Sequence, residues 1–559
     1  MASSDASETR MDTRSIGWFI ILIATAMQLA RIVGISAVHG ELPFLSANDR
    51  SRWCAIAALT QDGVWEIDKY QDILDSKGKS KIWYSIDMVK HRGEDGVVHS
   101  YSSKPPLLTL MLAAVCKPIS LAVGKPLTEE PFLIGRLVLI FVNLVPLFLW
   151  WCWFHRWLES HVPNGWTRWI LLNASIWGSF MTTFVVTLNN HLHGAIFFSI
   201  SLALAWQILN DAQSQRTTPW SVWLSVGVSA AMTVACELPA LAWAAAIAAI
   251  LLFADWKRTL IGFGSGSAMI AAAFLLTNIW AHGDWRPPYS HRGLGEEIGL
   301  IGTVAEGIYD PGAEPSIDAI RSSIDLTKHP LTEDAQVIPA RLDGVLQVID
   351  ESNGYRIALK KSERGWMAYR WDDWYDYPKS YWLPGNKKGV DIGEKDPAKY
   401  LFHFLIGHHG VFSLTPLWLW SLAGAFFWMR RGPSTLDRDR MDSSSLTGLR
   451  AWVLSERGIA AALLAVTLAC ILFYAVREQV DRNYAGVSSG FRWLFWMIPA
   501  WLWLAAPAIQ ACSKNRWMRS LVLVALVVGV VSATIPWTNP WTHPWPYRML
   551  MWQFPDAFQ

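Results

Sequence analysis

Apolar runs of about twenty residues recur along this chain, and they constrain its fold more than any other feature. The runs at 16–38, 259–280 and 517–537 each match the roughly 20 residues that a helix needs to cross the hydrocarbon of a bilayer. Hydrophobic residues make up 52% of the 559 residues and charged residues 17%, which is too apolar for an ordinary soluble protein. The sequence therefore predicts an all-α, multi-pass membrane protein.

Runs of this kind predict about eleven membrane-spanning helices. They lie at 16–38, 132–154, 166–187, 190–209, 219–236, 238–254, 259–280, 411–429, 457–475, 491–511 and 516–537. The same pattern divides the chain into an N-terminal transmembrane module at 1–280, a long polar segment at 281–407 and a C-terminal transmembrane module at 408–559.

Lysine and arginine accumulate in short cytoplasmic loops, so their distribution predicts how the helices are oriented. If the apolar run at 105–124 does not span, the opposite short loops near His191 and Glu237 carry no Lys or Arg. The cytoplasmic loops then carry Arg156, Arg168, Arg216, Lys257, Arg258, a cluster at 430–450, Lys514, Arg516 and Arg519. We therefore expect 105–124 to lie at the outer interface or to dip in and out, which Lys117 and Pro118 also favour.

This orientation places two long polar segments on the non-cytoplasmic side of the cell membrane, at 39–104 and 281–407. The second segment has Asp, Gly and Pro turns, an alternating stretch at 345–349 and an aromatic block at 366–382. We expect it to form a small α/β lid domain, while 105–124 forms an interfacial helix.

Composition also excludes some functions. The formal net charge is +2 and no basic domain stands apart from the apolar runs, so nucleic acid is not an expected partner. The six cysteines show no paired spacing and lie mostly in apolar runs, which predicts neither a disulfide framework nor a cysteine metal site. The first apolar run is longer than a signal-peptide core, so we expect it to remain as the first helix.

Two polar motifs stand at predicted helix ends. Asp49, in the segment Ala-Asn-Asp-Arg-Ser-Arg-Trp, follows the first span and precedes an amphipathic stretch, where a carboxylate can meet both a lipid headgroup and water. It can equally cap the following helix, since Asp is a favoured N-cap residue. Lys104 precedes Pro105 and Pro106, and its ammonium group can either snorkel to lipid phosphates or hold the phosphate of a lipid-linked substrate.

Together these motifs resemble the integral-membrane GT-C glycosyltransferases, in the branch that contains aminoarabinose transferases and protein O-mannosyltransferases. The matching residues are Asp49, Arg52, the segment Gly-Val-Trp-Glu-Ile at 63–67 and Lys-Pro-Pro-Leu at 104–107. The resemblance covers about 15–150, and the segments at 407–413 and 483–493 are similar to those of prokaryotic members. It implies a GT-C-like fold and transfer of a sugar from a polyprenyl-phosphate donor on the non-cytoplasmic face.

The resemblance assigns Asp49 as the catalytic base and Lys104, with Arg52 and Arg492, as groups that stabilise the leaving phosphate. Further candidate substrate-binding residues are His191, Glu237, Arg292 and His408. The family often has Asp-Glu where this chain has Asp49-Arg50, and aminoarabinose transferases have an acid where this chain has Ser103. Those acids can help to hold a divalent metal, so no metal ligand is assigned and metal dependence stays open.

The expected function is therefore that of a membrane hexosyl- or pentosyltransferase whose partners are membrane lipids, a polyprenyl-phosphate donor and an acceptor that can be a lipid, a glycan or a protein. Two other classes stay open. A transporter or flippase tends to show two related halves and ionisable residues near the midplane, which this sequence does not display. A non-catalytic assembly subunit fits the atypical Asp49-Arg50 pair.

Overall fold

The computed structural model describes residues 13–301, 314–340, 344–363, 365–383, 385–430 and 448–555. Much of the basic cluster expected at 430–450 lies outside these residues. The chain divides into two compact units. A helical unit comprises Met1–Ser85, Pro105–Thr277 and Lys388–Gln559, and a smaller unit comprises Ile86–Lys104 and Asn278–Lys387.

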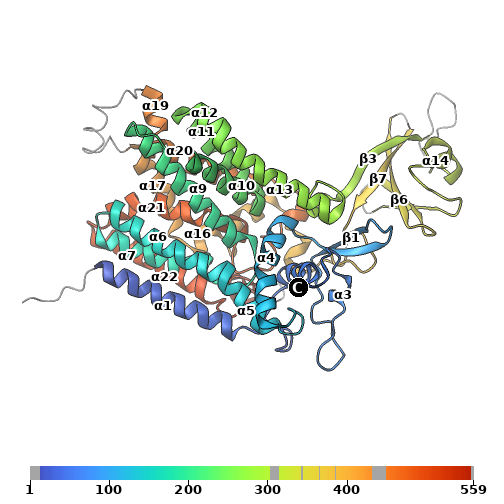
Figure 1. Ribbon diagram of the computed structural model, residues 1–559, viewed down its shortest axis with the longest axis horizontal. Coiled ribbons are helices and arrows are strands. Elements are labelled where there is room, and N and C mark those ends of the chain that lie inside the picture. The colour runs from blue at the N-terminus through green and yellow to red at the C-terminus, as the bar shows by residue number, and fades with distance from the viewer. Residues whose placement is uncertain are drawn as a thin grey trace, which may run out of the picture. The chain divides into compact units, whose positions relative to one another are not determined.

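Within the described residues, nine helical segments are long and apolar enough to cross a membrane. They are Ser15–Gly34 in α1 (Thr13–Gly34), α4 (Pro106–Val123), Pro131–His161, Gly165–Val186, α9 (Asn190–Gln213), Trp256–His282, α20 (Glu456–Ala475), Arg492–Cys512 and α22 (Arg516–Thr534). In Figure 1 the long helices of this unit, among them α1, α6 (Val145–His161), α9 and α22, lie side by side. The chain is thus a mostly helical, multi-pass membrane protein.

Several of these segments are not uniform α-helices. Pro131–His161 joins α5 (Pro131–Leu139), the π-helical turn η2 (Ile140–Leu144) and α6, and Gly165–Val186 joins α7 (Gly165–Ile176), α8 (Phe180–Thr183) and η3 (Phe184–Val186). Trp256–His282 joins α12 (Trp256–Arg258), η5 (Thr259–Phe263) and α13 (Gly264–His282), and Arg492–Cys512 joins η10 (Arg492–Met497) and α21 (Ile498–Cys512). Such irregular turns often mark functional positions in helices.

Eight of the predicted spans coincide with these segments, and three correspond to shorter apolar helices. The three are α10 (Trp220–Cys236), α11 (Leu241–Ala254) and α17 (Trp418–Arg430). Glu237 and Pro239 break the run between α10 and α11, while Thr415 and Pro416 separate α17 from α16 (Val411–Leu414). The predicted bounds 219–236 and 238–254 match α10 and the apolar helix Leu238–Ala254, whereas the run at 411–429 forms two shorter helices.

The run at 105–124, which the charge asymmetry excludes as a span, forms the regular helix α4 and meets the same length and hydropathy criteria as the others. Pro106 stands in its first turn, where a missing N–H costs nothing. The Lys117 ammonium donates a hydrogen bond to the carbonyl of Thr60 in η1 (Ala58–Asp62). Since this lysine has a partner within the protein, it does not need to reach water, and the argument against a span is weaker than the sequence suggested.

Shorter elements complete the helical unit. They are α2 (Ala47–Ala57), α3 (Asp68–Gln71), η4 (Leu238–Ala240), η8 (Gly389–Ile392), α15 (Pro397–Leu405), α19 (Gly448–Val453), η9 (Gln479–Asp481) and α23 (Trp545–Gln553). The helix α2 is almost entirely buried and packs against α4.

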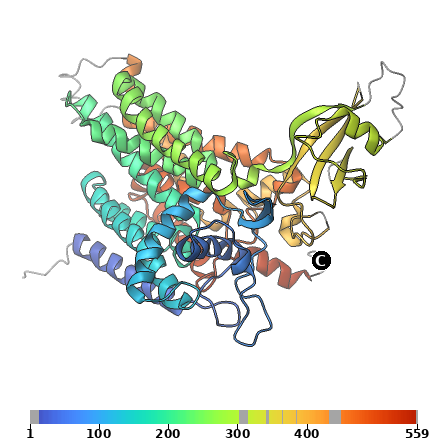
Figure 2. The ribbon, with the colours of Figure 1, turned by 45° about the vertical axis from the view of Figure 1, so that its right-hand side comes forward.

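The smaller unit contains a five-stranded antiparallel sheet in the order β3-β7-β6-β5-β4, which confirms a small sheet in the second polar segment. Its strands are β3 (Arg292–Ile301), β4 (Gln336–Pro339), β5 (Val345–Asp350), β6 (Tyr355–Ser362) and β7 (Gly365–Asp373). The helix α14 (Ile317–Ser323) buries Ile320 against Val348, Ile357 and Leu359 of the sheet. Figure 2 shows the sheet and α14 from a second direction.

A two-stranded sheet, formed by an earlier part of the chain at 88–102, also belongs to this unit. Its strands are β1 (Met88–Arg92) and β2 (Val98–Ser102). The Lys90 N–H donates a hydrogen bond to the Trp374 carbonyl at 2.8 Å. The His91 ring stacks on Tyr101 and lies 4.1 Å, between ring centroids, from Trp374. The η6 turn (Pro288–Ser290) leads into β3.

Cysteine labelling tests whether α4 crosses the membrane. Cysteines introduced at Ser103 and Lys125 flank α4, and the charge asymmetry predicts that a membrane-impermeant maleimide labels both from the non-cytoplasmic side. A cysteine at Lys257 is the matched control and should react from the cytoplasmic side. Labelling of Ser103 and Lys125 positions from opposite sides would instead make α4 a span and reverse the orientation of every later helix.

Candidate functional site

Between α7 and α9 the chain forms only the short turns α8 and η3 and a non-helical stretch at 187–189, and side chains from distant elements bind its backbone there. Carbonyl oxygens of residues 182–188 accept hydrogen bonds from Arg31, Asn143, Asn189 and Arg52. The donors belong to α1, η2 and α2 and to the segment itself. Because an unpaired backbone group costs several kcal/mol away from water, this network allows the segment to lie among membrane helices.

Asp49 stands in the third position of α2 and is 1% exposed. Its carboxylate accepts hydrogen bonds from the backbone N–H groups of Leu45 and Leu188, both at 3.0 Å, and from the Thr187 hydroxyl. The N-cap of α2 is Ser46, whose hydroxyl oxygen accepts from the Asp49 N–H. Asp49 is therefore not the N-cap residue; it stands three residues after the cap, and its carboxylate accepts from the N–H of Leu45, the residue before the cap.

Burial raises the pKa of Asp49 to about 6, against the opposing effect of its hydrogen bonds to Leu45, Thr187 and Leu188. The charged form is disfavoured because the carboxylate has exchanged water for a protein environment. Its pKa consequently lies close to neutral pH, where a carboxyl group can exchange protons readily.

A continuous path of contacts leads from Asp49 to a second polar group. The Thr187 hydroxyl, which bonds Asp49, accepts a hydrogen bond from the Trp541 indole N–H at 3.0 Å. The Arg492 guanidinium carbon lies 5.1 Å from the centroid of the Trp541 ring, within the range of a cation–π contact. The two groups of polar residues thus meet through one tryptophan.

Arg492, His191 and Glu237 form the second group. Arg492 Nη1 lies 2.9 Å from His191 Nε2, and His191 Nδ1 contacts the carboxylate of Glu237. Asn190 donates to the same carboxylate at 2.9 Å. His191 and Glu237 are buried, whereas Arg492 is half-buried. Since Arg492 can only donate, His191 Nε2 accepts and Nδ1 carries the proton that faces Glu237, which leaves Arg492 as the cation of this group that can meet a ligand.

Arg52 is enclosed more completely than its place in the motif suggests. Its side chain is 1% exposed, and the guanidinium donates to the Leu188 carbonyl at 3.4 Å. Asp49 binds the N–H of the same residue, so Asp49 and Arg52 together hold both backbone groups of Leu188. Arg52 thus orders the segment that precedes α9.

His408 belongs to a cluster of aromatic rings beside Arg492. Its Nδ1 lies 2.5 Å from Nδ1 of His409, and its ring contacts those of His403, Tyr484 and Tyr547. Burial lowers the pKa of His408 to about 3, so the ring is neutral. The cluster connects to Arg492 through the Ala485 carbonyl, which accepts from Arg492 Nε at 2.8 Å.

The backbone that presents this carbonyl is strained. Tyr484 and Ala485 have φ angles of 54° and 69°, in the left-handed region that costs a residue with a Cβ atom about 1–2 kcal/mol. The stacking of Tyr484 on His409 helps to offset this cost. Residues in such conformations often lie at functional sites.

Two predicted residues, Lys104 and Arg292, belong to the smaller unit. Lys104 Nζ lies 3.1 Å from the carboxylate of Asp87, and both side chains are mostly buried. The Arg292 guanidinium lies 4.3 Å from the centroid of the Tyr375 ring. The structure therefore brings Asp49, Arg52, His191, Glu237, Arg492 and His408 together in one unit, with Lys104 and Arg292 in the other.

The described residues include no group of three or more His, Cys, Asp or Glu side chains that could hold a metal ion. His191 is occupied by Glu237 and Arg492, and His193 Nδ1 contacts the Asn189 carbonyl at 2.8 Å. His191 and His193 thus each contact protein groups through a ring nitrogen.

Sequence reasoning missed Thr187, Asn143 and Trp541. Thr187 and Trp541 connect the two polar groups, and Asn143 bonds the carbonyls of Val185 and Thr187. An asparagine inside an apolar run was a usable signal, since it needs a partner there. Trp541 is one of 35 tryptophans and carried no such signal.

Comparison with known proteins adds one structural likeness. No protein-family model matches the chain, and no curated protein matches it. Among solved structures it is similar to the archaeal oligosaccharyltransferase AglB from Archaeoglobus fulgidus, in complex with an inhibitory peptide and a dolichol-phosphate. The identity is 12% and the TM-score 0.45, covering 96% of this chain and 57% of that chain. The chain thus spans little more than half the length of that protein.

The raised pKa of Asp49 predicts how stability varies with pH. The folded state binds the proton more tightly than the unfolded state, whose carboxyl group titrates near 3.8. The free energy of unfolding should therefore fall by on the order of 3 kcal/mol as pH rises from about 4 to about 6, and level off above. Asp49→Asn should remove this component, as measured by the apparent Tm in detergent between pH 4.5 and 7.

The matched control is Asp62→Asn. The hydrogen bonds from Lys69 and Tyr70 lower the pKa of Asp62, so its substitution should leave the decrease between pH 4 and 6 in place. Equal pH dependence of wild type and Asp49→Asn would show that another group is responsible.

Proposed function

We propose that this protein is a membrane glycosyltransferase that moves a sugar from a polyprenyl-phosphate donor to an acceptor on the non-cytoplasmic face. The observation that carries the proposal is the contact path from Asp49 through Thr187 and Trp541 to Arg492. It supports a site with a proton acceptor at one end and a cation at the other, as displacement of a sugar from a phosphate requires.

In the proposed reaction the acceptor hydroxyl oxygen attacks the anomeric carbon of the donor. Asp49 takes the hydroxyl proton, the new glycosidic bond forms, and the bond between the anomeric carbon and the phosphate oxygen breaks. The electron pair of that bond leaves with the polyprenyl phosphate. A single displacement of this kind inverts the anomeric configuration.

The charge that develops on the leaving phosphate needs a cation. Arg492 supports this role because it is half-buried, whereas Arg52 is enclosed and bonded to the Leu188 carbonyl. A planar guanidinium can bind two phosphate oxygens at once. His191 and Glu237 then act as positioning residues that hold Arg492 from the opposite side. Lys104 of the smaller unit is proposed as a second cation.

A transporter is less well supported, because the polar network gathers where α2, α9 and η10 begin and is not distributed along a path through the helices. A polyprenyl-phosphate substrate also needs its phosphate outside the hydrocarbon and its tail inside. A polar site at helix ends fits both requirements.

The Asp49→Asn variant tests the catalytic base. Turnover should fall by roughly 100-fold or more while the KM for donor changes little, because a base acts only as the acceptor proton leaves. The wild-type rate should decline below about pH 6, where the carboxylate becomes protonated, and this limb should disappear in the variant. The measurement is transfer of radiolabelled sugar from polyprenyl-phosphate donors in proteoliposomes.

Because Asn cannot accept the hydrogen bonds from both Leu45 and Leu188, the variant should also lose roughly 1–3 kcal/mol of stability. Asp49→Glu serves as the second variant, since it keeps a carboxylate and should retain measurable turnover with a pH limb. Near-normal turnover in a folded Asp49→Asn protein would contradict the assignment.

A comparison of two variants tests Lys104. If the lysine binds the donor phosphate, Lys104→Ala should raise the donor KM and lower kcat, whereas Asp87→Asn should leave the cation in place with donor KM little changed. If the pair is only structural, both variants should impair the protein alike through loss of stability. Donor KM, kcat and apparent Tm for both variants distinguish the two cases.

A further inference from the structure

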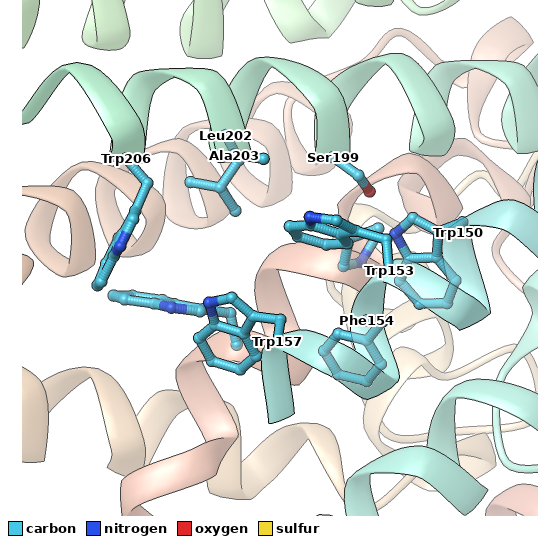
Figure 3. Close-up of a pocket in the computed structure, with 10 residues that line it drawn as sticks. Trp150, Trp153, Phe154, Trp157, Ser199, Leu202, Ala203 and Trp206 are labelled. Carbon is cyan, nitrogen blue, oxygen red and sulfur yellow. The ribbon is translucent and has the colours of Figure 1, made fainter. Parts of the chain in front are cut away.

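An aromatic pocket lies within the helical unit, between α6, α9 and α21. Its volume is about 140 Å³, and its wall includes Trp150, Trp153, Phe154 and Trp157 of α6, Trp206 of α9 and Trp503 of α21. Figure 3 shows Trp206 and Trp157 toward one end of the pocket and Trp150 with Ser199 toward the other. An apolar cavity on the order of 150 Å³ takes up a benzene-sized hydrocarbon in another protein.

The wall selects for an apolar occupant. The polar side chain of Ser199 donates back to the Ala195 carbonyl at 2.7 Å, so it offers its hydrogen to the helix and not to the pocket. Within the described residues, the indole N–H groups of Trp150 and Trp206 have no hydrogen-bond partner. These two N–H groups are buried in the packing of the helices and are not open to the pocket, so the wall offers an occupant apolar contacts and suits a hydrocarbon chain.

The position along the helices indicates from which side a chain enters. Trp157 is four residues from His161, the last residue of α6, which corresponds to about 6 Å of helix. Trp206 lies about 10 Å from the end of α9 but about 22 Å from His191, and the His161 ring contacts the Trp206 ring. One leaflet supplies about 15 Å of hydrocarbon, so a chain from the leaflet at the ends of α6 and α9 reaches the pocket without crossing the midplane.

Two further residues complete the entrance. Trp153 is 39% exposed on the outer surface of α6, where a chain can enter laterally from the bilayer. Arg156, which precedes Trp157, is exposed and carries a positive charge that attracts an anionic headgroup phosphate. Headgroup and chain thus find complementary partners on one helix.

We propose that this pocket binds an acyl chain of a membrane glycerolipid from the leaflet opposite to the Asp49–Arg492 site. The chain occupies the space between the rings of α6 and Trp503. The lipid fills a void between three helices and holds their packing together. This binding is independent of the proposed transfer reaction.

Photocrosslinking of the full chain in lipid nanodiscs tests the proposal. The probe is a phosphatidylcholine with a diazirine on its acyl chain, and crosslinked peptides are identified by mass spectrometry. Wild type should be labelled in the peptides around 150–157 and 199–206. Ala203→Trp fills the pocket and should reduce this labelling at least fivefold. Ile200→Trp adds the same ring to the 43% exposed side of α9 and should leave it unchanged.

Competition gives a second measurement. Unlabelled phosphatidylcholine added in excess should reduce the labelling of wild type in the peptides around 150–157 and 199–206. If Ala203→Trp does not fold, Ala203→Leu takes its place with a smaller expected decrease.

Two outcomes would overturn the proposal. Equal labelling of wild type and the folded Ala203 variant would show that no acyl chain occupies the pocket. Stronger labelling of the same peptides by a diazirine polyprenyl phosphate, without competition from phosphatidylcholine, would show that the pocket holds a polyprenyl chain instead.

Discussion

Backbone groups that are outside regular helices still need hydrogen-bond partners inside a helical membrane unit, and this need governs the arrangement of the candidate site. Between α7 and α9 the chain forms only two short turns and a non-helical stretch, and its carbonyls would be costly to leave unpaired among apolar helices. Arg31 of α1, Asn143 of η2 and Arg52 of α2 meet this need from three directions. Asp49 adds the N–H of Leu188, so the same contacts that stabilise the fold also fix the carboxylate beside Thr187.

The apolar pattern predicted most of the helices because hydrophobic length is the main requirement for a span. It failed where an interruption falls inside a predicted span, as Thr415 and Pro416 do between α16 and α17. It also could not place α4, because Lys117 counts against a span only if it has no partner, and the bond to the Thr60 carbonyl depends on tertiary packing. The length of an apolar run can be read from consecutive residues, whereas the cost of burying a charge depends on partners that are distant in the sequence.

The candidate site was likewise predictable only in part, because its residues could be selected from the sequence but their contacts could not. Asp49, His191, Glu237 and Arg492 could be selected from the sequence because charged or titratable residues at the ends of apolar runs need partners or a polar cavity. Which residues bond which could not be foreseen, since Arg492 and His191 are separated by some 300 residues and meet only in the folded chain. The N-cap of α2 shows the same limit over a short stretch of sequence. Ser46 and Asp49 both suit the position, and the register of the helix decides between them.

The charged groups of the site differ in how deeply they are buried. A buried ion pair costs several kcal/mol of desolvation, which excellent geometry must offset, so groups such as Glu237 and Arg52 are committed to their protein partners. Arg492 differs because one side of its guanidinium is held by His191, the Ala485 carbonyl and the Trp541 ring while the group stays half-buried. These three contacts fix the orientation of the guanidinium before any ligand arrives. A cation that is already oriented loses little conformational entropy when it binds phosphate. This saving offsets the backbone strain at Tyr484 and Ala485, which holds the Ala485 carbonyl against Arg492.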